Sequence, residues 1–179
     1  MFPVRYAFPA LLIVLLATRW GHFGTALSLP DASLAVFLLG GLWLGYWAFF
    51  AGLMVAAFGV DLALARSATE AGWCLTPAYW GLVPTYAVLW LAGRWLAKAE
   101  RAREAGLYTL VSVAAVSAAF VLSNVTFWAY SGHFADMGAL EYAFSVARYY
   151  PPYLGSAALY LALGWIVHHL LAMRQSHPA

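Results

Sequence analysis

Charged residues are scarce in this chain. Only 9% of its 179 residues are Asp, Glu, Lys or Arg, and 65% are hydrophobic, whereas a soluble domain carries about 25% charged residues. So few charges cannot cover a surface that faces water, and we therefore expect lipid to be the solvent of this chain. Because the net charge is only +2 and no basic run occurs, no nucleic-acid partner is expected.

Motifs for nucleotides and for protein-bound metals are also missing. The sequence has no Walker motif, no glycine-rich nucleotide loop and no Gly-x-Ser-x-Gly elbow. It also lacks Cys-x-x-Cys and His-Glu-x-x-His spacings. A transporter with this sequence would have to borrow energy or run downhill. A metal would have to arrive inside a ligand that supplies most of its coordination.

Long apolar stretches make up most of the chain, and a membrane span needs about 20 such residues. The prediction is an all-α integral membrane protein, a single transmembrane domain over residues 1–179 with six transmembrane helices. The expected spans are residues 6–20, two within 32–65, then 79–96, 107–130 and 153–171. The turn inside 32–65 is expected near Gly45-Tyr46-Trp47, with Gly40-Gly41 as the alternative. We expect the first span to be retained rather than cleaved as a signal.

The distribution of cations orients these spans. Six of the nine Lys and Arg residues fall on the side of the two termini: Arg5, Arg94, Lys98, Arg101, Arg103 and Arg174. By the positive-inside rule, both termini are then cytoplasmic. Loops 21–31, 66–78 and 131–152 would share the outer face.

Cys74 is the only cysteine in the chain, so no disulfide can form within it. A lone cysteine is most often a small buried hydrophobe. This one, however, is bracketed by the helix breakers Gly72 and Pro77 in an expected outer loop. Aromatic residues surround it in sequence: Trp73, Tyr79 and Trp80. This setting favours a ligand site.

Two histidines belong to the same expected outer face. His22 lies between glycines, which let the backbone approach a bulky ligand, and imidazole together with thiolate suits several transition metals. His133 is a second pocket candidate, although a hydrogen-bonded loop histidine is an equally simple interpretation. His168 and His169 are expected at the membrane interface.

Asp61 is the main ionisable residue inside an expected span. An intramembrane carboxylate is a candidate functional group by default. Arg66 follows five residues later, so an ion pair between Asp61 and Arg66 is the competing interpretation.

Six short helices with cytoplasmic termini, together with Cys74 and His22 in outer loops, resemble the substrate-binding S-components of energy-coupling factor vitamin transporters. More narrowly, the chain resembles the BtuM family of cobalamin-specific S-components of the bacterial inner membrane. The Tyr- and Pro-bearing connection at 149–153 before the last span fits this resemblance.

The resemblance implies cobalamin as the transported ligand and a set of site residues. Cys74 would ligate the cobalt from one axial face, His22 would lie near an axial position, and thiolate ligation would make decyanation of cyanocobalamin feasible. His133 and the aromatic residues would line the pocket for the flat corrin ring: Trp73, Tyr79, Trp80, Tyr130, Tyr149, Tyr150 and Tyr153. A shared energy-coupling factor module would be a partner.

One pattern departs from that family. Its first helix commonly carries Ala-x-x-x-Ala for docking onto the energising subunit, whereas this chain has Ala7, Ala10 and Ala17. Three other functions remain open on the sequence. They are a membrane haem protein with His22 and His133 as ligands, a membrane enzyme with Cys74 as nucleophile, and a structural subunit.

Overall fold

Helices form the framework of the chain. The computed structural model describes residues 4–19, 29–67, 75–99 and 104–175, and this part of the chain contains no strand. Its helices are α1 (Val4–Arg19), α2 (Ser33–Trp43), α3 (Trp47–Ser67), the 3₁₀ helix η2 (Pro77–Gly81), α4 (Leu82–Lys98), α5 (Ala105–Tyr130), α6 (Ala139–Ala147) and α7 (Tyr150–Gln175). The predicted all-α fold is therefore confirmed.

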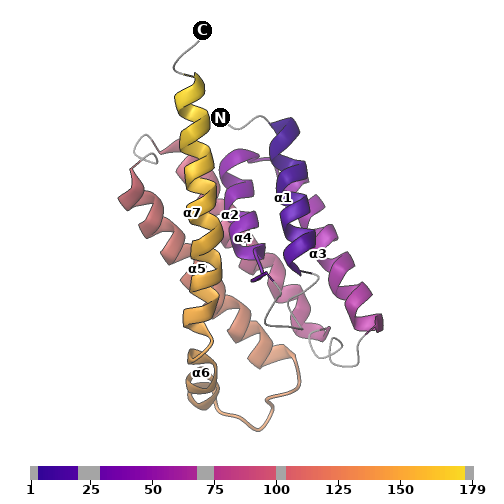
Figure 1. Ribbon diagram of the computed structural model, residues 1–179. Coiled ribbons are helices and arrows are strands. Elements are labelled where there is room, and N and C mark those ends of the chain that lie inside the picture. Colours follow the sequence, from indigo (N-terminus) through magenta and orange to yellow (C-terminus); the bar gives the residue numbers. More distant parts are fainter. Residues whose placement is uncertain (1–3, 20–28, 68–74, 100–103, 176–179) are drawn as a thin grey trace.

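The two ends of the described chain lie at the same end of the bundle. The start of α1 and the end of α7 lie at one end of the bundle, which we call the termini end, and α6 lies at the opposite end (Figure 1). Because α1 has 16 residues and α2 has 11, against 26 in α7, the Arg19 and Ser33 ends of these two helices stop well short of α6. The bundle is therefore deeper on the side of α5 and α7.

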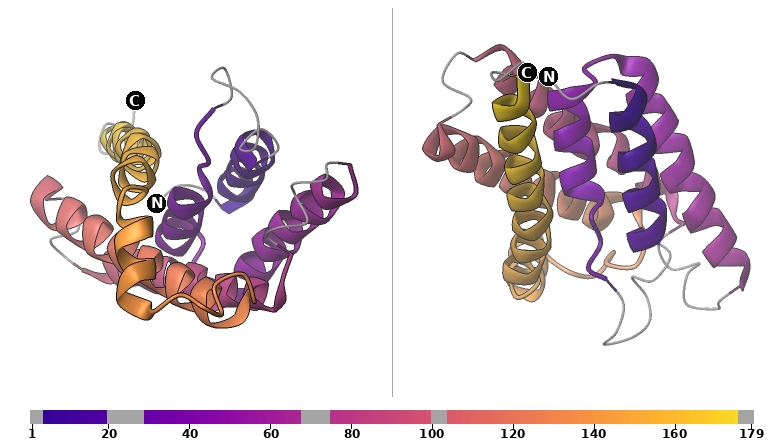
Figure 2. Two further views of the ribbon diagram at one scale, coloured as in Figure 1. Left: turned by 90° about the horizontal axis from the view of Figure 1, so that it is seen from below. Right: turned by 45° about the horizontal axis from the view of Figure 1, so that its top comes forward.

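Helix α2 occupies the centre of the bundle. It lies between α1 and α7 and packs on α4 (Figure 2), and every one of its residues is buried. An all-round apolar helix of this kind belongs in a core.

The turn between α2 and α3 lies where the sequence predicts it. Gly45 has φ +72°, a left-handed conformation that glycine adopts without steric cost. The N–H groups of Leu44 and Gly45 both donate to the Gly40 carbonyl, at 2.9 and 3.1 Å. This arrangement satisfies an otherwise unpaired carbonyl at the end of α2.

Among the residues that the structure describes, three helices are long and apolar enough to cross a membrane: Trp47–Arg66, Ala105–Tyr130 and Tyr150–Leu170. This finding is compatible with a membrane protein. Helix α2 is only about 16 Å long, against a hydrocarbon core of about 30 Å, so it cannot cross by itself.

The expected outer loop at 131–152 is wrong in part, because the structure contains α6 there and begins α7 at Tyr150. Pro151 and Pro152 follow directly. Proline is accommodated in the first turn of a helix because the N–H that it lacks has no intrahelical partner there. The proline pair therefore starts a helix instead of extending a loop.

Glycines allow α2 and α4 to pack at backbone distance. A Cβ at Gly93 would collide with the Leu38 carbonyl oxygen, and a Cβ at Gly41 would collide with the Trp90 backbone. Close approach through small residues is the usual basis of helix association in lipid.

We predict that Gly93→Ala destabilises the bundle by about 1–3 kcal/mol, the usual range for overpacking. The reason is that the obstacle is a backbone oxygen that cannot rotate away. Thermal unfolding in detergent, followed by circular dichroism, measures the loss.

Gly155→Ala on α7 is the matched control, because a Cβ there meets nothing within 4 Å and alanine is the better helix former. It should leave the melting temperature unchanged or raise it. Equal losses in both variants would contradict close packing at Gly93.

Candidate functional site

A buried ion pair joins α1 to α3. Arg19 Nε donates to Asp61 Oδ1 at 2.7 Å, and Arg19 Nη2 donates to Asp61 Oδ2 at 2.6 Å. The two residues are only 4% and 8% exposed. Two parallel charge-assisted bonds are the strongest form of such a contact and fix the plane of the guanidinium.

The remaining polar contacts extend this pair into a network. Arg19 Nη1 donates to Ser33 Oγ at 2.8 Å and to the Tyr86 hydroxyl at 3.0 Å. The Ser33 hydroxyl donates in turn to Asp31 Oδ1 at 2.7 Å. We call the six residues of this cluster the Arg19 network: Arg19, Asp31, Ser33, Asp61, Tyr79 and Tyr86.

Tyr79 connects the network to η2. Its hydroxyl donates to Asp61 Oδ2 at 2.8 Å, and its ring lies edge-on to Phe58 at 5.5 Å between centroids. Burial, reinforced by the hydrogen bond to the Asp61 carboxylate, raises the pKa of the Tyr79 phenol above its usual range. Tyr79 therefore keeps its proton at physiological pH and remains a hydrogen-bond donor.

The expected ion pair between Asp61 and Arg66 is wrong. Asp61 pairs with Arg19, and Arg66 is exposed. Five residues correspond to about 500° of helix, so Arg66 points about 140° away from Asp61.

Helix η2 begins as its sequence dictates. Thr76 Oγ1 accepts a hydrogen bond from the Ala78 N–H at 3.3 Å, and Pro77 occupies the first turn. A threonine cap followed by proline is a common start for a helix. The next turn carries Tyr79 toward Asp61, so the segment after Leu75 is held at both ends.

Trp80 and Tyr130 form an exposed aromatic pair. Their ring centroids lie 5.6 Å apart, and the residues are 55% and 52% exposed. Gly81 permits this contact between η2 and α5, because a Cβ there would collide with the Thr126 side chain. The ring planes are inclined by 56°, so these two accessible rings provide an angled apolar surface for a ligand.

The other expected aromatic residues that the structure describes lie on α7, at Tyr150 and Tyr153, and in the turn before it, at Tyr149. The rings of Tyr150 and Tyr153 both contact Phe120, at 5.2 and 5.1 Å, and the Tyr150 hydroxyl is hydrogen-bonded to Ser117 Oγ at 2.7 Å. These contacts are explained by packing of α7 on α5. Tyr149 is exposed and lies under the Arg148 guanidinium at 4.9 Å.

His133 lies in the turn after α5. Its ring is 6.0 Å from that of Phe127 and 6.4 Å from that of Phe134, and its backbone N–H donates to Ser131 Oγ at 3.2 Å. It is thus placed beside two aromatic rings. The part of the chain that the structure describes contains no group of three His, Cys, Asp or Glu that could hold a metal ion.

A cavity of about 390 Å³ lies between α5, α6 and α7. Its lining includes Phe120, Asn124, Trp128, Tyr142 and Tyr150. The Tyr142 hydroxyl of α6 donates to Asn124 Oδ1 of α5 at 3.2 Å, so this hydrogen bond links the two helices. Ligand sites occupy about 300–1,000 Å³, and this cavity is near the lower limit.

Trp73, Cys74 and His22 lie outside the described residues. The described chain stops before His22 at Arg19 and resumes after Cys74 at Leu75. Arg19 belongs to the network, and Leu75 lies four residues before Tyr79. Both expected metal-ligating positions are therefore connected to the Arg19 network by only a few residues of chain.

Sequence reasoning missed Arg19 as a member of the site. A cation at the end of an apolar run resembles an interfacial charge, and its partner Asp61 is 42 residues away. Comparison with known proteins adds nothing to this geometry, because no family model and no curated protein matches the chain.

We predict that Arg19→Met lowers the free energy of unfolding by about 3–5 kcal/mol, since removing one member of a buried pair strands the other charge. The double variant Arg19→Met/Asp61→Leu should lose less than the sum of the single losses, because it leaves neither charge unpaired. Denaturant unfolding in detergent measures all of these values.

The matched control is Arg66→Met, which removes an exposed arginine from α3 and should change stability by less than about 0.5 kcal/mol. Additive losses in the double variant would contradict direct coupling of Arg19 to Asp61.

Proposed function

We propose that this chain binds cobalamin and carries it across the bacterial inner membrane, with the thiolate of Cys74 as an axial ligand to cobalt. It would act in the manner of a BtuM-type S-component, with or without a shared energising module. The proposal combines the resemblance in sequence with the geometry of the described residues next to Cys74.

The observation that carries the proposal is the anchoring of the segment that follows Cys74. Thr76 caps η2, the Tyr79 hydroxyl is hydrogen-bonded to Asp61, and the Trp80 ring contacts that of Tyr130. Ligand sites gain affinity when their groups are ordered before binding. A preorganised aromatic surface a few residues along the chain from a lone cysteine supports a ligand with a broad, partly apolar ring that carries its own metal.

The arrangement of the helices supports the proposed topology. The described start of α1 and end of α7 lie at one end of the bundle (Figure 1), as an even number of crossings requires. The six helices expected from the sequence would supply these crossings, with the short α2 shielded from lipid by its neighbours. The excess of Lys and Arg near the termini then favours cytoplasmic termini.

The chemistry of a thiolate explains how the site could act on its cargo. Cobalt favours the deprotonated thiol, because metal ligation lowers its effective pKa. When cyanide occupies the axial position, ligand exchange forms a sulfur–cobalt bond and releases cyanide with its electron pair. Reductive decyanation would in addition need an external electron donor.

We predict that Cys74→Ala leaves the fold intact and abolishes the change in the cobalamin absorption spectrum on binding. The purified variant is mixed with cyanocobalamin and reductant, and released cyanide is measured together with the visible spectrum. Unchanged cyanide release by Cys74→Ala would refute ligation by this thiol.

Trp80→Ala should weaken cobalamin binding about tenfold, which corresponds to ~1.4 kcal/mol, because it removes half of the exposed aromatic pair. Isothermal calorimetry in detergent measures the affinity. Trp95→Ala is the matched control, since Trp95 is 54% exposed on α4 and lies outside the pair. Equal effects of the two substitutions would argue against a ligand surface at Trp80.

A further inference from the structure

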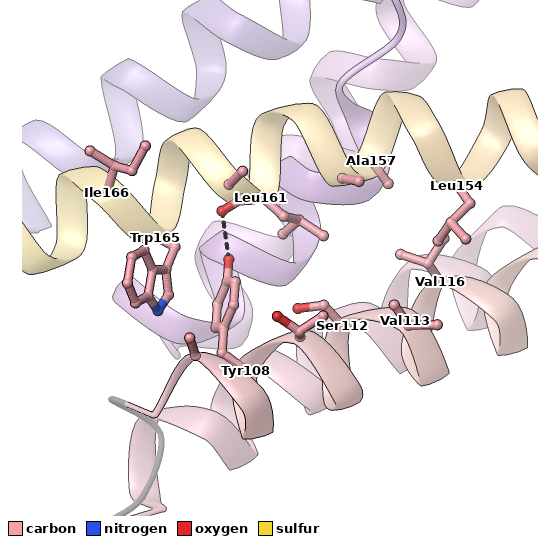
Figure 3. Close-up of a pocket in the computed structure, with 13 residues that line it drawn as sticks. Tyr108, Ser112, Val113, Val116, Leu154, Ala157, Leu161, Trp165 and Ile166 are labelled. Atoms are coloured by element: carbon pink, nitrogen blue, oxygen red, sulfur yellow. Dashed lines mark hydrogen bonds between the residues drawn. The ribbon is translucent and has the colours of Figure 1, made fainter.

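Besides the cavity between α5, α6 and α7, an apolar groove lies between α5 and α7 (Figure 3). Its volume is about 390 Å³, and none of its lining residues belongs to the Arg19 network or to the aromatic pair. One part is walled by Val113, Val116 and Leu154, and the other part holds Tyr108 and Trp165 (Figure 3). The groove is therefore apolar along most of its length and carries polar atoms toward one end.

The two helices are held apart at a set distance. The Tyr108 hydroxyl of α5 donates to the Leu161 carbonyl of α7 at 3.0 Å (Figure 3). Because this bond crosses the groove floor, the groove is already formed without a ligand.

Two polar atoms of the groove are left without partners. Trp165 Nε1 and Ser112 Oγ are buried and make no hydrogen bond within the described part of the chain, and Ser112 is only 5% exposed. In lipid there is no water to satisfy such groups, so each one has a substantial free-energy cost until a partner arrives. An indole N–H only donates, so the missing partner of Trp165 is an acceptor.

The depth of these atoms matches the membrane interface. Trp165 lies five residues before Leu170, where the apolar span of α7 ends, or about 8 Å along the helix axis. Tryptophan and tyrosine are enriched at this depth. One helical turn nearer the end of α7 is His169, whose ring lies 4.0 Å from that of Trp165 and whose buried Nε2 has no hydrogen-bond partner among the residues that the structure describes.

We propose that this groove binds one ester-linked phospholipid. An acyl chain lies along Val113, Val116 and Leu154, and the ester carbonyls accept hydrogen bonds from Trp165 and Ser112. The phosphate or glycerol lies toward His169. Along the groove, an apolar wall comes first, then the two hydrogen-bond donors, then His169. A phospholipid has its groups in the same order: acyl chain, ester carbonyls and polar headgroup.

The test compares ester-linked and ether-linked phosphatidylethanolamine, which differ in the carbonyl groups. Native mass spectrometry of the full chain measures retention of each lipid. The native chain should retain one ester-linked lipid about two- to tenfold more tightly than the ether-linked lipid, the range for a hydrogen bond. Trp165→Phe should reduce this preference and Trp165→Phe/Ser112→Ala should bind both lipids equally, whereas Trp95→Phe should keep the preference.

A second pair of variants tests the groove itself. Ala162→Phe fills it from an exposed position and should abolish the retained lipid, while Leu163→Phe, on the same helix but outside the lining, should not. Equal retention of the two lipids by the native chain would overturn the proposal. Unchanged retention by Ala162→Phe, or displacement of the lipid by an equimolar prenylated quinone, would also overturn it.

Discussion

The buried pair of Arg19 and Asp61 is the constraint on which the rest of this structure depends. A guanidinium in an apolar bundle must have all its donors satisfied, and here the partners come from α3, from the start of α2 and from α4. The Tyr79 hydroxyl also donates to the Asp61 carboxylate, at Oδ2. Satisfying one charge therefore sets the relative positions of α1, α2, α3, η2 and α4.

Apolar packing also holds these helices together. Helix α2 is short and wholly buried, and the glycines between α2 and α4 remove the side chains that would separate them. The Phe37 and Tyr86 rings stack at 4.2 Å in the same interface, so one residue of the Arg19 network is also part of the core. Helices α5 and α7 pack less closely on this core. This leaves space for the cavity between α5, α6 and α7 and for the groove between α5 and α7.

Local sequence signals were sufficient to predict the all-α fold and the turn at Gly45, because apolar run length and a left-handed glycine act over short distances. The pairing of Arg19 with Asp61 could not be predicted, since it depends on which helices become neighbours. Helix α6 was hidden by the polar composition of 131–152, and the proline pair after Tyr150 looked like a loop. Of the expected aromatic site, Trp80 and Tyr130 come together, whereas Tyr150 and Tyr153 pack on α5. The roles of Cys74 and His22 stay predictions.

The separation of Arg19 from Asp61 along the chain has a consequence for biosynthesis. The ribosome completes α1 before α3 has been made, so Arg19, the last residue of α1, at first exists without its carboxylate partner. Removing or withholding one member of a buried pair leaves the other charge with a high free-energy cost of burial. Arg19 can therefore take its buried position only after synthesis has reached Asp61, and α1 and α3 reach their final packing together rather than one after the other.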